Sequence, residues 1–195
     1  TSGSLSATHN KKLKNNFNVH KNVIFFPYPG TYKNKKTKYT EEESINFVKK
    51  FFKNNKIFPP AAIIECGQAV SGIILPSKKY FKSIFEILKK NKVLIIVDEV
   101  WNGFGRTGKF FSFQNYKLKP DLVCAGKAMS SSLPLSILIG SSRLLKSWPA
   151  GIHTSTFQGN PVSCALACAT IDTINKYKLL KKSLTIEKNF CEQLD

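Results

Sequence analysis

The feature that most restricts the fold of this chain is a run of five apolar residues at 93–97, Val-Leu-Ile-Ile-Val. No position in the run is polar, so a strand formed here is expected to be covered on both faces. Strands of this kind occur in sheets that pack between helices. Asp98 and Glu99 follow directly. They predict carboxylates at the carboxyl end of a buried strand, where open α/β sheets bind ligands.

The rest of the chain predicts further strands joined by amphipathic helices. Thr40, with Glu43 three residues on, predicts a capped helix start. Three segments show apolar residues at helical spacing or small residues packed along a helix: 44–52, 77–90 and 161–177. Four more short apolar runs are expected to be strands: 23–26, 61–64, 122–125 and 136–140. This order predicts an α/β layered fold with a mixed or parallel sheet.

The charge of the chain does not by itself indicate a partner. The formal net charge is +18, from 30 Lys and Arg against 12 Asp and Glu, but only 2 of the 30 are Arg. Proteins that recognise nucleic acids rely on Arg for bidentate contacts, and no RNA-binding motif with interleaved aromatic residues is present. The lysines predict only nonspecific, salt-sensitive affinity, so no specific nucleic-acid partner is expected.

The cysteines and the apolar runs indicate in which cellular compartment the protein is expected. The odd set of five cysteines contains no CxxC pair, lies mostly in apolar segments, and predicts buried free thiols in a reducing compartment. The three histidines lack a ligand spacing near them, so no metal site is expected. No apolar run reaches the ~20 residues of a membrane helix, and no secretory signal opens the chain. We expect no membrane partner and a cytoplasmic location, with an organellar one left open.

Lys127 differs from the other lysines in its position. It follows the apolar run at 122–125 and Gly126, in a setting where an amine is expected to be desolvated. Desolvation favours the uncharged amine, which is a nucleophile. A lysine that forms a Schiff base and an aspartate that pairs with a pyridinium nitrogen are the two groups that pyridoxal phosphate requires of a protein. Lys127 and Asp98 therefore predict a site for that cofactor.

A glycine-rich loop lies between these two residues. Three of the six residues from Gly103 to Gly108 are Gly, so the backbone is expected to turn sharply there. The loop lacks the GxGxxG spacing and the strand-to-helix turn of a nucleotide site. Its pattern therefore disfavours nucleotide phosphate binding.

Several blocks of the sequence, in order, resemble the class III, omega-type family of pyridoxal-phosphate aminotransferases. They are TSGSLSAT at 1–8, IIECGQ at 63–68, VDEVWNGFGRTGKFF at 97–111, PDLVCAGKAMSSSLPLS at 120–136 and TSTFQGNP at 154–161. The resemblance implies an α/β fold, the central part of the large domain of a fold-type I transferase, with a mostly parallel sheet and flanking helices. It also implies a homodimer.

The resemblance assigns a role to each matching residue. Lys127 would carry pyridoxal 5'-phosphate as a Schiff base and move the proton during catalysis. Asp98 would keep the pyridine nitrogen protonated, and Val100 would pack on one face of the ring. Thr156 would donate a hydrogen bond to the cofactor phosphate across the dimer, with its neighbour Ser155 ranked below it.

Two further residues have supporting roles by the same resemblance. Glu65 would lie under the cofactor and orient polar groups. Arg106 is expected to have a structural role in its loop rather than a role in substrate binding.

The chain also departs from the family pattern. Trp101 stands where many members have a Gln that binds the ring hydroxyl, and Cys66 replaces a usual Pro. Residues 130–132 are Ser where the family is rich in Gly, so a positive φ there would be strained. Val70 stands where members that use 2-oxoglutarate often have Glu. This difference disfavours 2-oxoglutarate as the amino acceptor.

The resemblance covers nearly all of this chain but only part of the family's length. We therefore expect residues 1–195 to be a partial cofactor-binding domain, without the family's N-terminal segment and C-terminal small domain. The expected reaction moves an amino group from an amine, omega-amino acid or amino acid to a keto acid or aldehyde. The alternatives are an inactive remnant of such an enzyme, or an aminomutase, racemase or phospho-lyase of the same fold.

Overall fold

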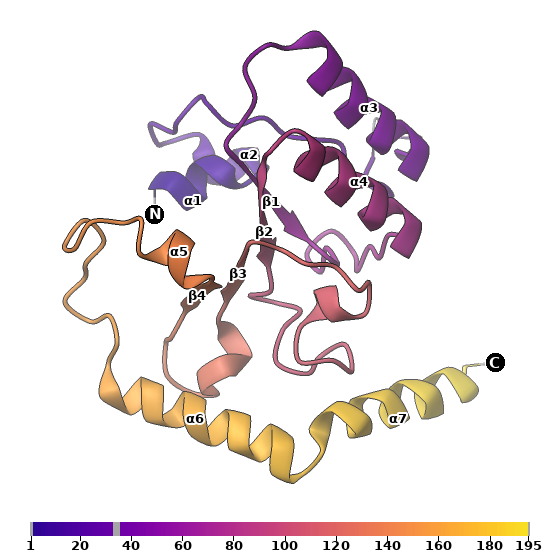
Figure 1. Ribbon diagram of the computed structural model, residues 1–195. Helices are drawn as coiled ribbons and strands as arrows, with labels where there is room; N and C mark the ends of the chain where they lie inside the picture. Colours follow the sequence, from indigo (N-terminus) through magenta and orange to yellow (C-terminus); the bar gives the residue numbers. More distant parts are fainter. Residues whose placement is uncertain (1, 33–35, 195) are drawn as a thin grey trace.

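The computed structural model describes residues 2–32 and 36–194 (Figure 1). Thr1, in the first of the resemblance blocks, lies outside these ranges. The elements in chain order are α1 (Ser2–Ala7), α2 (Lys11–Lys14), α3 (Glu41–Asn54), β1 (Ala61–Glu65), α4 (Lys78–Lys90), β2 (Leu94–Asp98), the 3₁₀ turn η1 (Ser112–Gln114), β3 (Leu122–Ala125), the 3₁₀ turn η2 (Lys127–Ser130), β4 (Ile137–Gly140), α5 (Ser142–Leu145), α6 (Pro161–Lys176) and α7 (Leu179–Glu192).

The four strands form one mixed sheet in the order β1-β2-β3-β4. The first three strands are parallel, and β4 pairs antiparallel with β3. The register sets Glu65 beside Asp98 and Asp98 beside Cys124, which places these side chains at the carboxyl ends of three adjacent strands. This sheet confirms the α/β prediction and four of the five expected strands.

The strand expected at 23–26 is wrong. These residues have no regular secondary structure and pair with no other strand, and Pro27 follows them. A strand requires a ladder of hydrogen bonds to a neighbour, which this segment lacks. Its apolar character instead serves local packing, because the ring of Phe26 lies 6.0 Å from that of Phe47 and 5.8 Å from that of Phe51.

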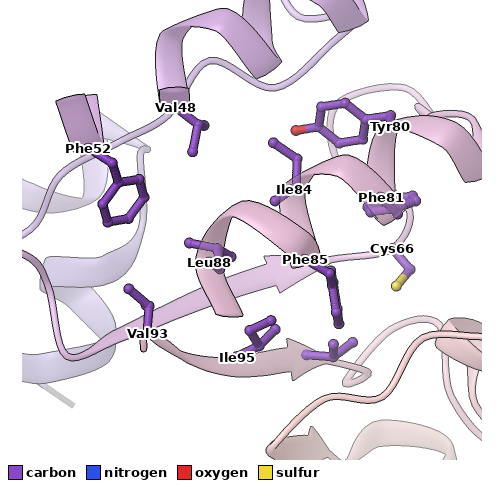
Figure 2. Close-up of a cluster of buried hydrophobic side chains, with 11 residues drawn as sticks. Val48, Phe52, Cys66, Tyr80, Phe81, Ile84, Phe85, Leu88, Val93 and Ile95 are labelled. Atoms are coloured by element: carbon purple, nitrogen blue, oxygen red, sulfur yellow. The ribbon is translucent and has the colours of Figure 1, made fainter. Parts of the chain in front are cut away.

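Helices α3 and α4 cover one face of the sheet (Figure 1). The predicted capping box begins α3, since the Thr40 hydroxyl accepts from the Glu43 N–H at 3.2 Å and the Glu43 carboxylate accepts from the Thr40 N–H at 2.8 Å. Ile95 of β2 and Phe81 of α4 are fully buried between the layers. Figure 2 shows this core, formed by Val48, Phe52, Cys66, Tyr80, Phe81, Ile84, Phe85, Leu88, Val93, Ile95 and Val97.

A second core lies at the carboxyl ends of the strands. It joins Ala125 of β3 and Met129 of η2 to Ala167 and Ile174 of α6, together with Phe104 of the glycine-rich loop. Helix α6 therefore packs on the turn that begins with Lys127. The small residues along α6 permit this close approach.

The other face of the sheet is only partly covered, which corrects the expectation of cover on both faces. Ile95 and Val97 point to the buried face and have no exposed surface, whereas Leu94 and Ile96 are half-buried. Ile63 of β1, on the same face as Ile96, is 51% exposed. Glu65, Asp98 and Cys124 share this open face, because side chains alternate along a strand.

The prediction of buried cysteines holds for one of the five. Cys66 is buried, Cys124 is half-buried, and the other three, Cys164, Cys168 and Cys191, are exposed. The helical segments that contain the last three present them to solvent, since only one side of α6 reaches the second core. All five are free thiols. Within residues 2–32 and 36–194, no group of three or more His, Cys, Asp or Glu is arranged to hold a metal ion.

The thiols are expected to fall into distinct reactivity classes. Burial, with a smaller effect of Glu99, raises the pKa of Cys66 to about 12. At pH 8 only roughly one Cys66 in ten thousand would be a thiolate, the form that reacts. A disulfide reagent at pH 8 should therefore modify three thiols rapidly, Cys124 more slowly, and Cys66 only after denaturation. Rapid reaction of Cys66, identified by peptide mapping, would contradict this.

In the described part of the chain, no helix combines the length and the apolar character needed to cross a bilayer.

Candidate active site

Three ionisable side chains meet where the parallel strands end. Glu65 ends β1, Asp98 ends β2, and Lys127 begins η2 directly after β3 and Gly126. The register pairs Glu65 with Asp98. Because parallel strands end at one edge of a sheet, Glu65 and Lys127 share one site although 62 positions separate them in the sequence.

The electrostatics of Glu65 reflect this proximity. Burial is the main cause that raises the pKa of this half-buried carboxyl, and the negative charge of Asp98 raises it further. The positive charge of Lys127 acts in the opposite direction. The site is therefore a group of two acids and one amine whose charges influence one another.

The Asp98 carboxylate is held by its own loop. Its Oδ1 accepts from the backbone N–H of Val100 at 2.9 Å. Within the described part of the chain the carboxylate makes this one hydrogen bond, so Oδ2 is available to a cationic group of a ligand. Val100 is half-buried next to it and offers an apolar surface at the same edge.

Lys127 is exposed, which corrects the expectation of a desolvated amine. The residue lies at the start of a 3₁₀ turn at the open edge of the sheet, and its Nζ lies 4.3 Å from the ring centroid of Trp101. Its φ of 44° is in the left-handed region, which a residue other than Gly adopts at a cost of about 1–2 kcal/mol. Such strain is often found at functional sites.

The serine run after Lys127 also contains a strained residue. Ser131 has a φ of 58° and a ψ of −63°, so the expected strain at a positive φ is confirmed. The neighbouring hydroxyl of Ser130 donates to the carbonyl of Leu133, which holds the turn closed. The substitution of Ser for Gly is therefore accommodated at the expense of backbone strain.

Glu99 has a structural role that the sequence pattern did not reveal. It has no exposed surface, and its carboxylate accepts from the Ser112 N–H at 3.0 Å, the Ser112 hydroxyl at 2.6 Å and the Phe113 N–H at 2.9 Å. Burial raises the pKa of this carboxyl, while these hydrogen bonds act to lower it. Alternation along a strand separates it from Asp98 and is the signal that could have distinguished the two acids.

The glycine-rich loop packs beside the site and against α7. Gly105 and Gly108 have positive φ values of 93° and 76°, and a Cβ at Gly108 would collide with Leu184. Arg106 donates from Nε to the carbonyl of Trp101 at 2.8 Å. This contact within the loop agrees with the structural role expected for Arg106.

Ser155 and Thr156 lie apart from this group. Both are exposed in the segment that connects α5 to α6 (Figure 1). No contact between described residues joins either side chain to Glu65, Asp98 or Lys127. Asn160 ends the segment and begins α6, where its Oδ1 accepts from the N–H groups of Val162 at 3.0 Å and Ser163 at 3.1 Å.

An amine and a carboxylate with a free oxygen at one sheet edge suit a ligand with an aldehyde and a basic ring nitrogen. A family model described as class-III aminotransferase matches residues 1–195, the whole chain. The chain belongs to the class III aminotransferase family. This result confirms the resemblance found in the sequence and, with it, pyridoxal phosphate as the cofactor of the family.

Curated relatives include enzymes of two kinds. The acetylornithine aminotransferase of Archaeoglobus fulgidus is 31% identical, over 100% of this chain and 48% of its own length. The isoleucine 2-epimerase of Lentilactobacillus buchneri is 34% identical, over 84% of this chain and 38% of its own length. The chain therefore spans less than half the length of these relatives.

Solved structures of aminotransferases share the fold. An ornithine aminotransferase from Toxoplasma gondii, whose active site holds pyridoxal phosphate at partial occupancy, has a TM-score of 0.78 and 25% identity, over 100% of this chain and 42% of that one. The ornithine δ-aminotransferase of Plasmodium falciparum has a TM-score of 0.68 and 32% identity, over 77% and 40%. These likenesses confirm the expected fold-type I architecture of the aminotransferases.

Proposed function

We propose that this chain is part of the cofactor-binding domain of a pyridoxal-phosphate-dependent aminotransferase, with residues 1–195 corresponding to a central portion of that domain. The observation that carries the proposal is the placement of Lys127 and Asp98 at one edge of the sheet, where the charges of Asp98 and Lys127 both act on Glu65. An amine and a carboxylate in this arrangement are the donor set that the cofactor requires.

Each residue of the proposed site would have a separate role. The amino group of Lys127 would bind the aldehyde of the cofactor and, when free, would act as the base and acid that moves the proton. The carboxylate of Asp98, whose Oδ1 accepts from the Val100 N–H, would keep the ring nitrogen protonated, and Val100 would pack against the ring. Glu65, half-buried beside Asp98, would lie under the cofactor and orient neighbouring polar groups. When bound, pyridoxal phosphate withdraws the electrons of the bond that is broken.

The phosphate contact is proposed to come from a second subunit. Thr156, and after it Ser155, would donate to the cofactor phosphate across a homodimer. Their exposure and their separation from Lys127 within one chain support this proposal. The set of free cysteines supports a cytoplasmic location, because thiols persist in reducing compartments.

The proposed reaction is transfer of an amino group between a small amino donor and a keto acid. Relatives named as ornithine and acetylornithine aminotransferases support an amino-acid donor. Relatives named as isoleucine 2-epimerase and leucine/methionine racemase favour a second candidate, the inversion of an amino-acid α-carbon. Both reactions would begin with removal of the α-carbon proton by Lys127, but inversion would return a proton to the α-carbon, whereas amino transfer would not. Product analysis with a chiral amino acid and a keto acid separates them.

The proposal is tested by trapping the cofactor on the protein. Pyridoxal phosphate added to the purified chain should produce a visible absorbance band, and borohydride should fix it on the peptide that contains Lys127. The labelling of other lysines in the same digest, such as exposed Lys82 on α4, measures the nonspecific background. Labelling spread evenly over the lysines, with no preference for Lys127, would instead indicate an inactive remnant.

Asp98→Asn is expected to weaken the hold on pyridoxal phosphate about tenfold. Asn keeps an oxygen for the Val100 N–H but loses the charge that strengthens a hydrogen bond to a protonated ring, a difference of about 1.4 kcal/mol. Spectrophotometric titration with the cofactor measures this. Glu65→Gln is the matched control, because it removes the adjacent charge and should change the affinity less. Equal losses in the two variants would contradict the role of Asp98.

A further inference from the structure

The indole ring of Trp101 contacts two cations of this chain. Lys127 Nζ lies 4.3 Å from its ring centroid, and the guanidinium carbon of Arg106 lies 5.3 Å from it. Both distances are within the ~6 Å at which an aromatic face attracts a positive charge. Neither contact is needed for the roles proposed above for Lys127 and Asp98.

Trp101 is held more firmly than Lys127. Arg106 donates from Nε to the Trp101 carbonyl at 2.8 Å, so it holds the backbone of the same residue whose ring it contacts. The next residue, Asn102, is buried and donates from Nδ2 to the carbonyl of Gly67 at 2.9 Å. Lys127, by contrast, is exposed and has a flexible four-carbon stem. The backbone that carries the ring is therefore held in place by hydrogen bonds, whereas the amine ends a flexible stem.

We propose that Trp101 is a positioning residue that holds the uncombined amino group of Lys127 as an ammonium over its indole face. This inference rests on the proposed function, in which the Lys127 amine binds the cofactor aldehyde. The ring attracts the ammonium but not the neutral amine, so the contact competes with that reaction. Glu65 and Asp98 are the charged side chains that share this edge of the sheet, and both remain unchanged in every variant compared below.

The exposure of the Trp101 ring determines how strongly its contact with the ammonium competes with the reaction of Lys127 with an aldehyde. Trp101 is 42% exposed, and contacts of this kind at exposed sites change an equilibrium by about two- to fivefold. Removal of the indole should therefore make Lys127 react faster with an aldehyde at neutral pH. A residue that only supported the local fold would not produce a gain confined to Lys127.

The experiment compares labelling rates at Lys127 and at exposed Lys82. Pyridoxal phosphate condenses with an amine with loss of water, and borohydride reduces the resulting C=N bond to a stable secondary amine. In Trp101→Leu the initial rate at Lys127, relative to Lys82, should rise about two- to fivefold. Trp101→Phe keeps an aromatic face and should give a smaller rise. Trp148→Leu is the matched control, because Trp148 contacts His153 and should leave the ratio unchanged.

The outcomes separate the inference from the proposed function. If Lys127 is labelled preferentially but its relative rate in Trp101→Leu is unchanged or lower, the role of Trp101 is wrong and the cofactor lysine stands. A rise at Lys127 and Lys82 together would show general loosening of the fold and would also overturn the role. If the unsubstituted protein shows no preference for Lys127, both proposals fail.

Discussion

Lys127→Ala is expected to abolish both the visible band and the borohydride-stable label on this protein. The chain has many other lysines, but among those that the structure describes Lys127 is the one placed at the sheet edge with Asp98 and Glu65. In the proposed site the carboxylate of Asp98 would hold the protonated cofactor ring beside this amine, whereas a surface lysine reacts with pyridoxal phosphate only by chance encounter. We expect the labelling at this position to vanish and the affinity for the cofactor to fall about a hundredfold or more, since the covalent bond is lost.

The controls for this prediction separate charge from nucleophilicity. Lys127→Arg retains a positive charge, and with it the attraction to Trp101, but it cannot bind the aldehyde. It should lose the band as fully as the Ala variant. Lys82→Ala on the exposed side of α4 should keep the band. A band that persisted in both Lys127 variants would remove the cofactor role from this residue.

Glu99→Ala is expected to lower the free energy of unfolding by about 3 kcal/mol. The side chain is fully buried and its carboxylate accepts three hydrogen bonds, all from Ser112 and Phe113. Each buried donor left without a partner costs about 1–3 kcal/mol, and partial access of water to the new cavity reduces the sum. Urea unfolding followed by circular dichroism measures the loss. It is a large fraction of the stability of an ordinary domain.

Two variants control the prediction for Glu99. Glu99→Gln keeps Oε1 for the Ser112 hydroxyl and the Phe113 N–H but loses the acceptor of the Ser112 N–H, so a smaller loss of about 1 kcal/mol is expected. Glu192→Ala removes an exposed acid that pairs with Lys188 at 3.5 Å and should change stability by less than about 0.5 kcal/mol. Equal effects at Glu99 and Glu192 would contradict a structural role for Glu99.

Local patterns predicted most of the fold because they are produced by local forces. The capped start of α3 at Thr40 and the apolar run of β2 were both identified, and each depends on neighbours within a few residues. The segment 23–26 shows the limit of such patterns. An apolar run becomes a strand only when another strand supplies hydrogen bonds. The residues of the run do not show whether such a partner strand is present.

The candidate site was predicted in part for the same reason. Asp98 and Lys127 could be singled out because each follows a buried strand, and the resemblance to the class III family gave them roles. The same resemblance assigned Glu65 to the site, and the register of β1 and β2 sets it beside Asp98. The exposure of Lys127 and its contact with Trp101 could not be predicted, because they depend on how the turn after β3 meets the glycine-rich loop.

The sequence by itself determined the four strands of the sheet, the helices α3, α4 and α6, the candidate site residues, and the family to which the chain belongs. These properties follow from side-chain periodicity and from residue type, both of which can be read from the sequence. Only the tertiary structure decided that one face of the sheet is covered and the other partly open, that Glu99 supports the fold while Asp98 faces the site, and that Lys127 is exposed. These depend on packing between residues distant in sequence, and the run at 93–97 shows it: all five residues are apolar, yet Ile95 and Val97 are fully buried while Leu94 and Ile96 are not.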